Sequence, residues 1–292
     1  MKKRIPDISA VFESPLFFIA PLCFFIAVCL FFPLGTLLVQ SATEKITGAF
    51  PVTENYRSLV THFMFPRAFM NTVLIAAISL ALQGSLGLAL ALFLHHTRVA
   101  PRFLFALLLV PLGVPTIVNG AVMRYIFDLH GFLNEALLRL GVIAQPVDWL
   151  DGSLVSLGVL VAADLWKVLP FVVLILVAGR KTIDRQLYEA AAIDGASAWQ
   201  QFRYITMPCI KPFLVLALIL RGIDVFRLFE LPLALFGSSF PILSTYAYFE
   251  FSRYNNPYRA AAASWILIVS IGVFVIAYFW YDRVRRREGG AA

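Results

Sequence analysis

Apolar residues dominate this chain and come in six long runs separated by short polar segments. The runs cover residues 15–40, 69–94, 103–123, 154–178, 212–235 and 260–281. Each reaches or exceeds the ~20 residues that an α-helix needs to cross the hydrocarbon core of a bilayer. None alternates apolar and polar residues with the period of two that a membrane-spanning strand requires. The pattern therefore predicts an all-α membrane protein with six transmembrane helices.

The composition agrees with this prediction and excludes an ordinary soluble protein. Hydrophobic residues make up 60% of the 292 residues and charged residues only 14%, against about 25% charged residues in a typical soluble domain. The run at 15–40 follows a basic start, as in a signal peptide, but it is longer than the ~7–15 apolar residues of a cleaved signal. We therefore expect it to remain as a membrane anchor.

Basic residues are unevenly divided between the two sides of the predicted spans. Six spans place both ends of the chain on one side, and that side carries twice as many Lys and Arg residues as the other. By the positive-inside rule, the N- and C-termini are cytoplasmic. Topology and lipid contact account for the net charge of +7, which requires no nucleic-acid partner. The residues on the predicted cytoplasmic side are Lys2, Lys3, Arg4, Arg98, Arg102, Arg180, Lys181, Arg185, Arg203, Lys211, Arg283, Arg285, Arg286 and Arg287, and those on the other side are Lys45, Arg57, Arg67, Arg124, Arg139, Arg253 and Arg259.

The cytoplasmic segment between the fourth and fifth runs predicts two short helices. Asp184 is a good N-cap, and the residues after it are mostly helix formers. Gly195 ends this helix, and Ser197 with Gln200 forms the capping box of a second helix that ends before Pro208. A first helix this short is below the ~12–15 residues that are marginally stable alone in water. It must therefore be held by the rest of the chain or by a partner.

This first helix is suited to docking against another subunit. Ala190 and Ala191 give it a narrow face of small side chains, while Glu189 and Asp194 place charges at its edges for a basic partner.

The same segment resembles the EAA loop of the permeases of binding-protein-dependent ABC importers. That loop reads Glu-Ala-Ala, three residues, Gly, nine residues and Ile-x-Leu-Pro, and here its last part is Ile205-Thr-Met-Pro208. Met in place of Leu keeps the volume and polarity of the side chain. The resemblance implies that an ATPase subunit is coupled through Glu189, Ala190, Ala191, Asp194 and Gly195.

The resemblance extends from about Asn71 to Tyr281 and indicates the carbohydrate-uptake branch of this family. One stretch departs from it: that branch usually has Leu-Thr-Gly-Gly-Gly-Pro where this chain has Leu235-Phe-Gly-Ser-Ser239. The external loop there faces the solute-binding protein in the family, so the departure leaves that partner and its sugar open. The matching stretches are Asn71-Thr72, Gly131-Phe-Leu-Asn134 followed by Leu137 and Gly141, Trp166-Lys167 with Pro170-Phe171, and Phe226-Arg-Leu-Phe229-Glu230.

The resemblance implies a type I ABC importer permease fold that crosses a bacterial inner membrane several times. Two permease chains, expected to differ, face a central cavity above two ATPase subunits. A periplasmic or lipid-anchored binding protein delivers a sugar of the trehalose or maltose type. The expected parts are an N-terminal arm with the first transmembrane helix and external loop at 1–66, the transmembrane core at 67–282 with its EAA loop at about 182–208, and a basic cytoplasmic tail at 283–292.

No ATPase site is expected in this chain. A P-loop needs Gly-Lys followed by Ser or Thr, and none of the lysines here follows Gly. We expect no catalytic residue and no cofactor in the chain, with ATP and Mg²⁺ bound by the partner ATPase subunits. The 3 cysteines and 4 histidines lack the spacing of a metal site.

Two alternative functions share some of these features. An importer of a polyol, glycerol or glycerol phosphate would have the same architecture, and only the ligand of its binding protein distinguishes it from a sugar importer. A secondary transporter usually shows internal repeats with corresponding broken helices, and the chain has no convincing repeat. The importer is therefore the preferred interpretation.

Charged residues inside the predicted spans are candidates for the solute path, because a charge at mid-bilayer is costly unless it is paired or hydrated. Residues three apart on a helix are neighbours, so each set can also neutralise itself along one ridge. The sequence leaves open a structural role and direct contact with solute. The charged candidates are Asp164 and Lys167 in the fourth run, and Arg221, Asp224, Arg227 and Glu230 in the fifth; Asn119, Trp166 and Tyr246 are added because a sugar needs polar groups beside a flat apolar ring.

The third run contains several helix-breaking residues. Pro111, Gly113, Pro115 and Gly120 lie close together, and such breaks persist in membranes mainly where protein or a water-filled cavity satisfies the freed backbone. We expect a kinked helix here, lining the pore or kinked to improve packing.

Overall fold

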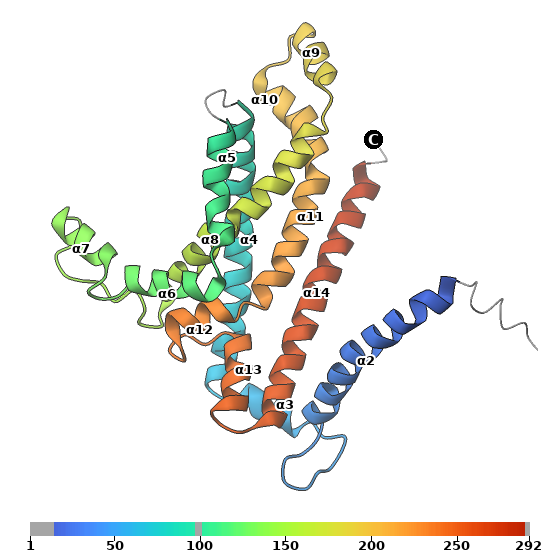
Figure 1. The fold of residues 1–292 in the computed structure, drawn as a ribbon, viewed down its shortest axis with the longest axis vertical. Coiled ribbons are helices and arrows are strands. Elements are labelled where there is room, and N and C mark those ends of the chain that lie inside the picture. Colours follow the sequence, from blue (N-terminus) through green and yellow to red (C-terminus); the bar gives the residue numbers. More distant parts are fainter. Residues whose placement is uncertain (1–14, 97–100, 290–292) are drawn as a thin grey trace, which may run out of the picture.

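The computed structural model describes residues 15–96 and 101–289, and every regular element within these ranges is a helix (Figure 1). The prediction of an all-α protein is confirmed. The elements in chain order are α2 (Pro15–Ser41), α3 (Glu54–Thr61), α4 (Met64–His96), α5 (Pro101–Leu109), the 3₁₀ turn η1 (Val110–Gly113), α6 (Thr116–Ile126), α7 (Phe132–Arg139), α8 (Leu154–Lys181), α9 (Arg185–Ile193), α10 (Ala198–Gln201), the π-helical segment η2 (Phe202–Thr206), α11 (Met207–Phe226), α12 (Glu230–Phe236), α13 (Leu243–Ser252) and α14 (Pro257–Gly289).

Four of the predicted spans are single helices long and apolar enough to cross a bilayer. They are α2, α4, α8 and α14. In α2 none of the most apolar stretch is buried inside the chain, whereas half of the corresponding stretch in α8 is buried. The helix α8 therefore lies at the centre of the bundle, whereas the side chains of α2 are exposed on its outside.

The third predicted span is a broken helix. The chain turns by 95° between α5 with η1 on one side and α6 on the other. Pro111 lies at the start of η1 and Pro115 is the N-cap of α6, and neither proline can donate a backbone hydrogen bond to continue a helix. The expected kink is thus a turn of nearly a right angle, and α6 lies across the bundle (Figure 1).

The fifth predicted span, at 212–235, is wrong in its extent. The helix α11 begins earlier, at Met207, and ends at Phe226, while the remaining apolar residues form the separate helix α12. The side chains of Leu231, Leu235 and Phe236 in α12 are buried. Close packing on α6 explains the turn, because a Cβ on Gly120 would lie only 2.5 Å from the Cβ of Ala234.

The two ends of the molecule carry different elements. The helices α9 and α10 form one end, and α3 and α13 lie at the other (Figure 1). The C-terminal end of α14 and the N-terminal end of α2 both point toward the end that carries α9 (Figure 1). The basic residues Lys2, Lys3, Arg4 and Arg98, which contributed to the predicted orientation, lie outside the described residues.

Candidate functional site

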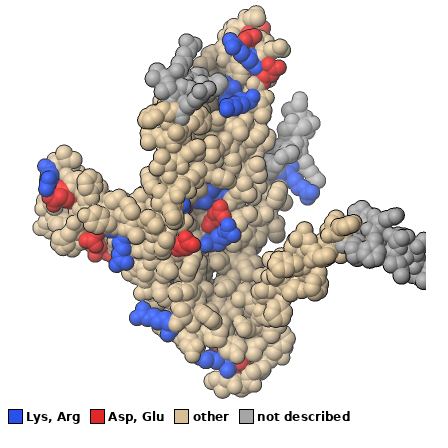
Figure 2. All heavy atoms as spheres, viewed as in Figure 1, with Lys and Arg blue, Asp and Glu red and all other residues tan. Residues whose placement is uncertain are grey.

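All six charged residues of the fourth and fifth runs line one cavity of about 480 Å³. We call it the central pocket. Figure 2 shows acidic and basic side chains gathered midway along a body that is otherwise largely uncharged. The wall consists of Leu112, Thr116, Asp164, Lys167, Val168, Phe171, Arg221, Asp224, Arg227, Leu228, Phe229, Glu230 and Leu231.

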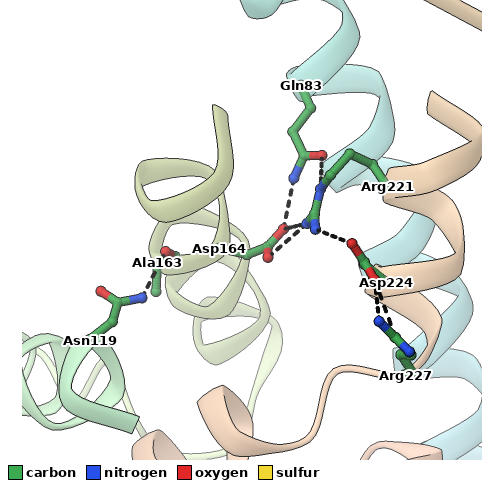
Figure 3. Close-up of polar contacts among 7 residues, drawn as sticks. All are labelled: Gln83, Asn119, Ala163, Asp164, Arg221, Asp224 and Arg227. Carbon is green, nitrogen blue, oxygen red and sulfur yellow. Dashed lines mark hydrogen bonds and ion pairs between the residues drawn. The ribbon is translucent and has the colours of Figure 1, made fainter. Parts of the chain in front are cut away.

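A buried polar triad joins three helices beside this pocket (Figure 3). From α11, Nη2 of Arg221 donates to both carboxylate oxygens of Asp164 in α8 at 3.0 Å, and Nε donates to Oε1 of Gln83 in α4 at 3.0 Å. The amide Nε2 of Gln83 completes the ring by donating to Asp164 at 2.7 Å. The side chains of Arg221 and Asp164 are only 4% and 2% exposed. The triad thus pairs two buried charges with each other, and its hydrogen bonds link α4, α8 and α11.

Part of the expected ridge of charges is present on α11. Asp224 lies 3.5 Å from Nη1 of Arg221 and 2.8 Å from Nη2 of Arg227. The spacing of Asp164 and Lys167 allowed a pair within α8, but Asp164 pairs with Arg221 on the neighbouring helix instead. Glu230 follows the break between α11 and α12, and it forms no ion pair with another described residue. The ridge therefore ends at Arg227.

Lys167 bonds to the backbone of the broken span instead. Its Nζ donates a hydrogen bond to the carbonyl oxygen of Val114, which lies between η1 and α6. Irregular backbone at membrane depth needs partners for its polar groups, because lipid offers none. The Lys167 ammonium therefore helps to hold the sharp turn between α5 and α6.

Replacing Lys167 with methionine tests this contact. The change keeps the side-chain length but removes the donor, and leaving this part-buried carbonyl unpaired should cost ~1 kcal/mol. We expect the melting temperature of the detergent-purified chain to fall by a few degrees, as followed by circular dichroism. Lys181→Met, at the exposed end of the same helix, is the matched control. Equal melting temperatures for the two variants would show that the contact does not stabilise the turn.

The three uncharged candidates lie outside the wall of the central pocket. Asn119 is buried and its Nδ2 donates to the carbonyl of Ala163 at 3.2 Å, which ties α6 to α8 (Figure 3). Trp166 is 44% exposed. Tyr246 is buried in α13, with its hydroxyl 3.3 Å from Nδ1 of His62. The structure therefore brings together the charged candidates but not these three.

Gln83 is a member of the triad that was not among the predicted site residues. It is fully buried in α4, within the apolar run at 69–94. A strongly polar side chain in the middle of a bilayer-length run is itself a signal, because such residues usually face the interior of a bundle and mark functional or structural polar contacts.

The segment containing Asn134 is held together by that one side chain. Its Nδ2 donates to the carbonyls of Leu129 and Val147 at 2.9 and 2.8 Å, and its Oδ1 accepts from the N–H of Val147 and from Nε1 of Trp149. These bonds close the loop around α7, which extends away from the helical body (Figure 1).

The EAA segment forms the expected pair of short helices at one end of the molecule. Asp184 caps α9 by accepting from the N–H of Gln186 at 2.9 Å, and Ser197 with Gln200 forms the capping box of α10. Gly195 between them has a φ of +76°, which favours glycine. The second helix does not end before Pro208: it continues through η2 into α11, where Pro208 lies in the first turn.

The helix α9 is almost completely uncovered. None of its residues is buried, and the side chain of Glu189 is 59% exposed while it pairs with Arg185 at 2.9 Å. Nearby apolar side chains are exposed as well, with Ile193 at 87% and Trp199 at 69%. An exposed apolar patch rimmed by charges is typical of a protein interaction site.

A bundle of membrane-length helices around a pocket with charged side chains in its wall, with an uncovered helix pair at one end, is the architecture expected of a membrane transport subunit. Residues 83–289 match the family described as "Binding-protein-dependent transport system inner membrane component". This chain belongs to that family, which confirms the resemblance found in the EAA segment.

Relatives and solved structures agree with the family. The chain is 35% identical over 240 residues to the "Trehalose/maltose transport system permease protein MalF" of Thermococcus litoralis, covering 80% of this chain and 79% of the relative. It is 27% identical over 280 residues to the "Lactose transport system permease protein LacF" of Rhizobium radiobacter, covering 92% and 94%. A bacterial ABC transporter "involved in the import of the acidic polysaccharide alginate" shares the fold, with a TM-score of 0.81 and 21% identity over 96% of this chain and 98% of that chain.

Proposed function

We propose that this chain is the permease subunit of an ATP-driven importer that carries a sugar across the bacterial inner membrane. The observation that carries the proposal is the largely uncovered α9, which presents the exposed Glu189 and Ala190 and the partly covered Ala191 at the end of the bundle. The names of the relatives, which include permeases for trehalose, maltose and lactose, support a sugar as the solute.

The proposed topology has six spans with both termini in the cytoplasm. The spans are α2, α4, the broken span of α5, η1 and α6, and then α8, α11 and α14. The excess of Lys and Arg on the side that carries α9 supports this orientation. The charges of α11 face the triad and the central pocket rather than lipid, which supports its place among the spans although it is more polar than the others.

The proposed assembly contains two permease chains, two ATPase subunits and a solute-binding protein. ATP and Mg²⁺ bind the ATPase subunits, since the sequence has no P-loop lysine. A solved relative of the fold is an alginate transporter in complex with a periplasmic protein that holds an alginate pentasaccharide, which supports a binding protein on the side opposite α9.

The proposed mechanism follows from where α9 is attached. The chain enters α9 from α8 and leaves it, through α10 and η2, to α11, and these two helices carry Asp164 and Arg221. When ATP closes the ATPase subunits, movement of α9 shifts α8 and α11 and opens the pocket to the other side. The triad keeps the two helices together, and the more exposed Asp224, Arg227 and Glu230 offer donors and acceptors to the hydroxyl groups of the solute.

Reconstitution tests the proposal directly. The chain, its partner permease, its ATPase and its binding protein are placed in liposomes with ATP inside and the binding protein outside. We expect uptake of labelled trehalose, maltose or lactose only when hydrolysable ATP is present. Uptake restricted to glycerol or glycerol phosphate would support the polyol alternative. Uptake driven by a proton gradient without ATP would contradict the importer and support a secondary transporter.

A further inference from the structure

We propose that Tyr188 is the residue that ties the EAA helix to both α8 and α11, and so transmits movement of that helix to the pocket. The proposal rests on the proposed function, because it assumes that an ATPase moves α9. Tyr188 directly precedes Glu189 and lies outside the set of residues expected to contact the ATPase.

The side chain of Tyr188 faces the bundle rather than the surroundings. In α9 only Tyr188 and Ala191 are partly covered, and the other residues of this helix are exposed. The Tyr188 hydroxyl lies 2.7 Å from Oγ1 of Thr206. Its ring lies under the guanidinium of Arg180, with 4.5 Å between Cζ of Arg180 and the ring centroid. A single side chain therefore contacts two different segments of the body.

These two segments are the ends of the helices that form the triad. Arg180 lies in the last turn of α8, and Thr206 is the last residue of η2, directly before α11. Asp164 and Arg221 lie farther along the same two helices, roughly 20–25 Å away at 1.5 Å per residue. The helices α8 and α11 are thus joined at two levels, by Tyr188 at the end and by the Asp164–Arg221 ion pair within the bundle.

The packing between these levels favours joint movement of the two helices. At Gly179 in α8, an added Cβ would lie 2.4 Å from Cγ of Phe213 in α11, so the side chain of Phe213 packs directly on the backbone of α8 here. The segment η2 is π-helical, a rare geometry that is frequent at functional sites. Movement of α9 therefore reaches both helices through the bonds of Tyr188, and they move as a pair.

Thr206 allows this link to be tested apart from ATPase binding. Only 4% of Thr206 is exposed, so a partner subunit cannot touch its side chain. Thr206→Val keeps the shape and removes the hydroxyl, and Tyr188→Phe removes the other half of the same bond. Thr206→Ser keeps the hydroxyl. Thr182→Val is the matched control, because the hydroxyl of Thr182 donates to the carbonyl of Gly179 at the end of α8 and bonds to no other residue that the structure describes.

The measurement reports how the nucleotide state of the ATPase reaches the pocket. A cysteine in place of Glu230, in a chain whose 3 natural cysteines are replaced by serine, is labelled with N-ethylmaleimide in the full complex. The readout is the ratio of the labelling rates with and without ATP plus vanadate. Losing one neutral hydrogen bond, worth about 1 kcal/mol, corresponds to about a five-fold change. We expect Thr206→Val and Tyr188→Phe each to reduce the effect of ATP plus vanadate on the labelling rate about five-fold. The ATPase should still co-purify with both variants.

Four further outcomes complete the test. The double variant should be no worse than either single variant, since both remove the same bond, and Thr206→Ser and Thr182→Val should keep the parent ratio. An unchanged ratio in both Thr206→Val and Tyr188→Phe would overturn the role of Tyr188 and leave the importer intact. Failure of the unmodified chain to bind any ATPase would instead overturn the proposed function.

Discussion

Replacing Asp164 with alanine should destabilise the chain more than any other single change in the central pocket. The substitution leaves Arg221 as a buried charge without its bidentate partner, and breaking such a pair costs about 3–5 kcal/mol. Gln83 loses the acceptor of its Nε2 group at the same time. The measurement is the free energy of unfolding in mixed micelles, followed by circular dichroism as the fraction of denaturing detergent rises.

Two matched variants define what a different result would mean. Asp224→Ala removes the other acidic partner of Arg221, but its side chain is 42% exposed, so we expect a loss of ~1 kcal/mol or less. Arg57→Ala, at an exposed position of α3, should change nothing measurable. If Asp164→Ala were tolerated as well as Asp224→Ala, the triad would not hold the bundle together.

Replacing the Asp164–Arg221 ion pair with apolar residues distinguishes a structural role of this pair from direct contact with the solute. Well-packed apolar residues often replace a buried ion pair at little cost, so Asp164→Leu combined with Arg221→Met should recover most of the lost stability. Recovery of transport together with stability would assign the ion pair a structural role. Recovery of stability without transport would assign its charges to the solute path.

The second large effect is expected at Gly195, between α9 and α10. Valine at this position must adopt a φ of +76°, which costs a β-branched residue at least ~1–2 kcal/mol. Since α9 is too short to be stable by itself, this strain should displace it. We expect Gly195→Val and Gly195→Pro to insert normally into the membrane but to lose the ATPase in a pull-down from solubilised membranes. Glu189→Lys should have the same effect by reversing an exposed charge.

Gly141 provides the control for this prediction. It has a φ of +68° and, like Gly195, has no heavy atom within 4 Å of an added Cβ, but it lies beside α7 rather than in the EAA segment. Gly141→Val carries the same backbone strain and should leave ATPase binding unchanged. Normal recovery of the ATPase with Gly195→Val and Glu189→Lys would contradict the assignment of α9 as the docking helix.

The features that the sequence predicted well depend on neighbouring residues. The capping box of Ser197 and Gln200 and the turn at Gly195 involve residues that are close together in the chain. The four unbroken spans needed only a count of consecutive apolar residues. The break near Pro111 and Pro115 was also predictable, because proline removes a backbone donor wherever it stands.

The features that the sequence predicted poorly depend on which helices meet. An apolar run does not distinguish lipid from protein, so the buried Leu231 and Leu235 of α12 were assigned to the fifth span. The spacing of three between Asp164 and Lys167 suggested a local pair, but the nearer partner of Asp164 is Arg221, 57 residues away. Gln83 was not predicted for the same reason: it bonds to Asp164, which is distant in the sequence. Only the packing of α4, α8 and α11 brings these side chains together.

The wall of the central pocket has a balanced charge. It contains as many acidic groups, Asp164, Asp224 and Glu230, as basic groups, Lys167, Arg221 and Arg227. Moving one elementary charge across 100 mV changes the free energy by about 2.3 kcal/mol. A movement that carries this whole set together displaces no net charge. The conformational step should therefore be electrically silent, with a rate that does not depend on the membrane potential when the solute is uncharged.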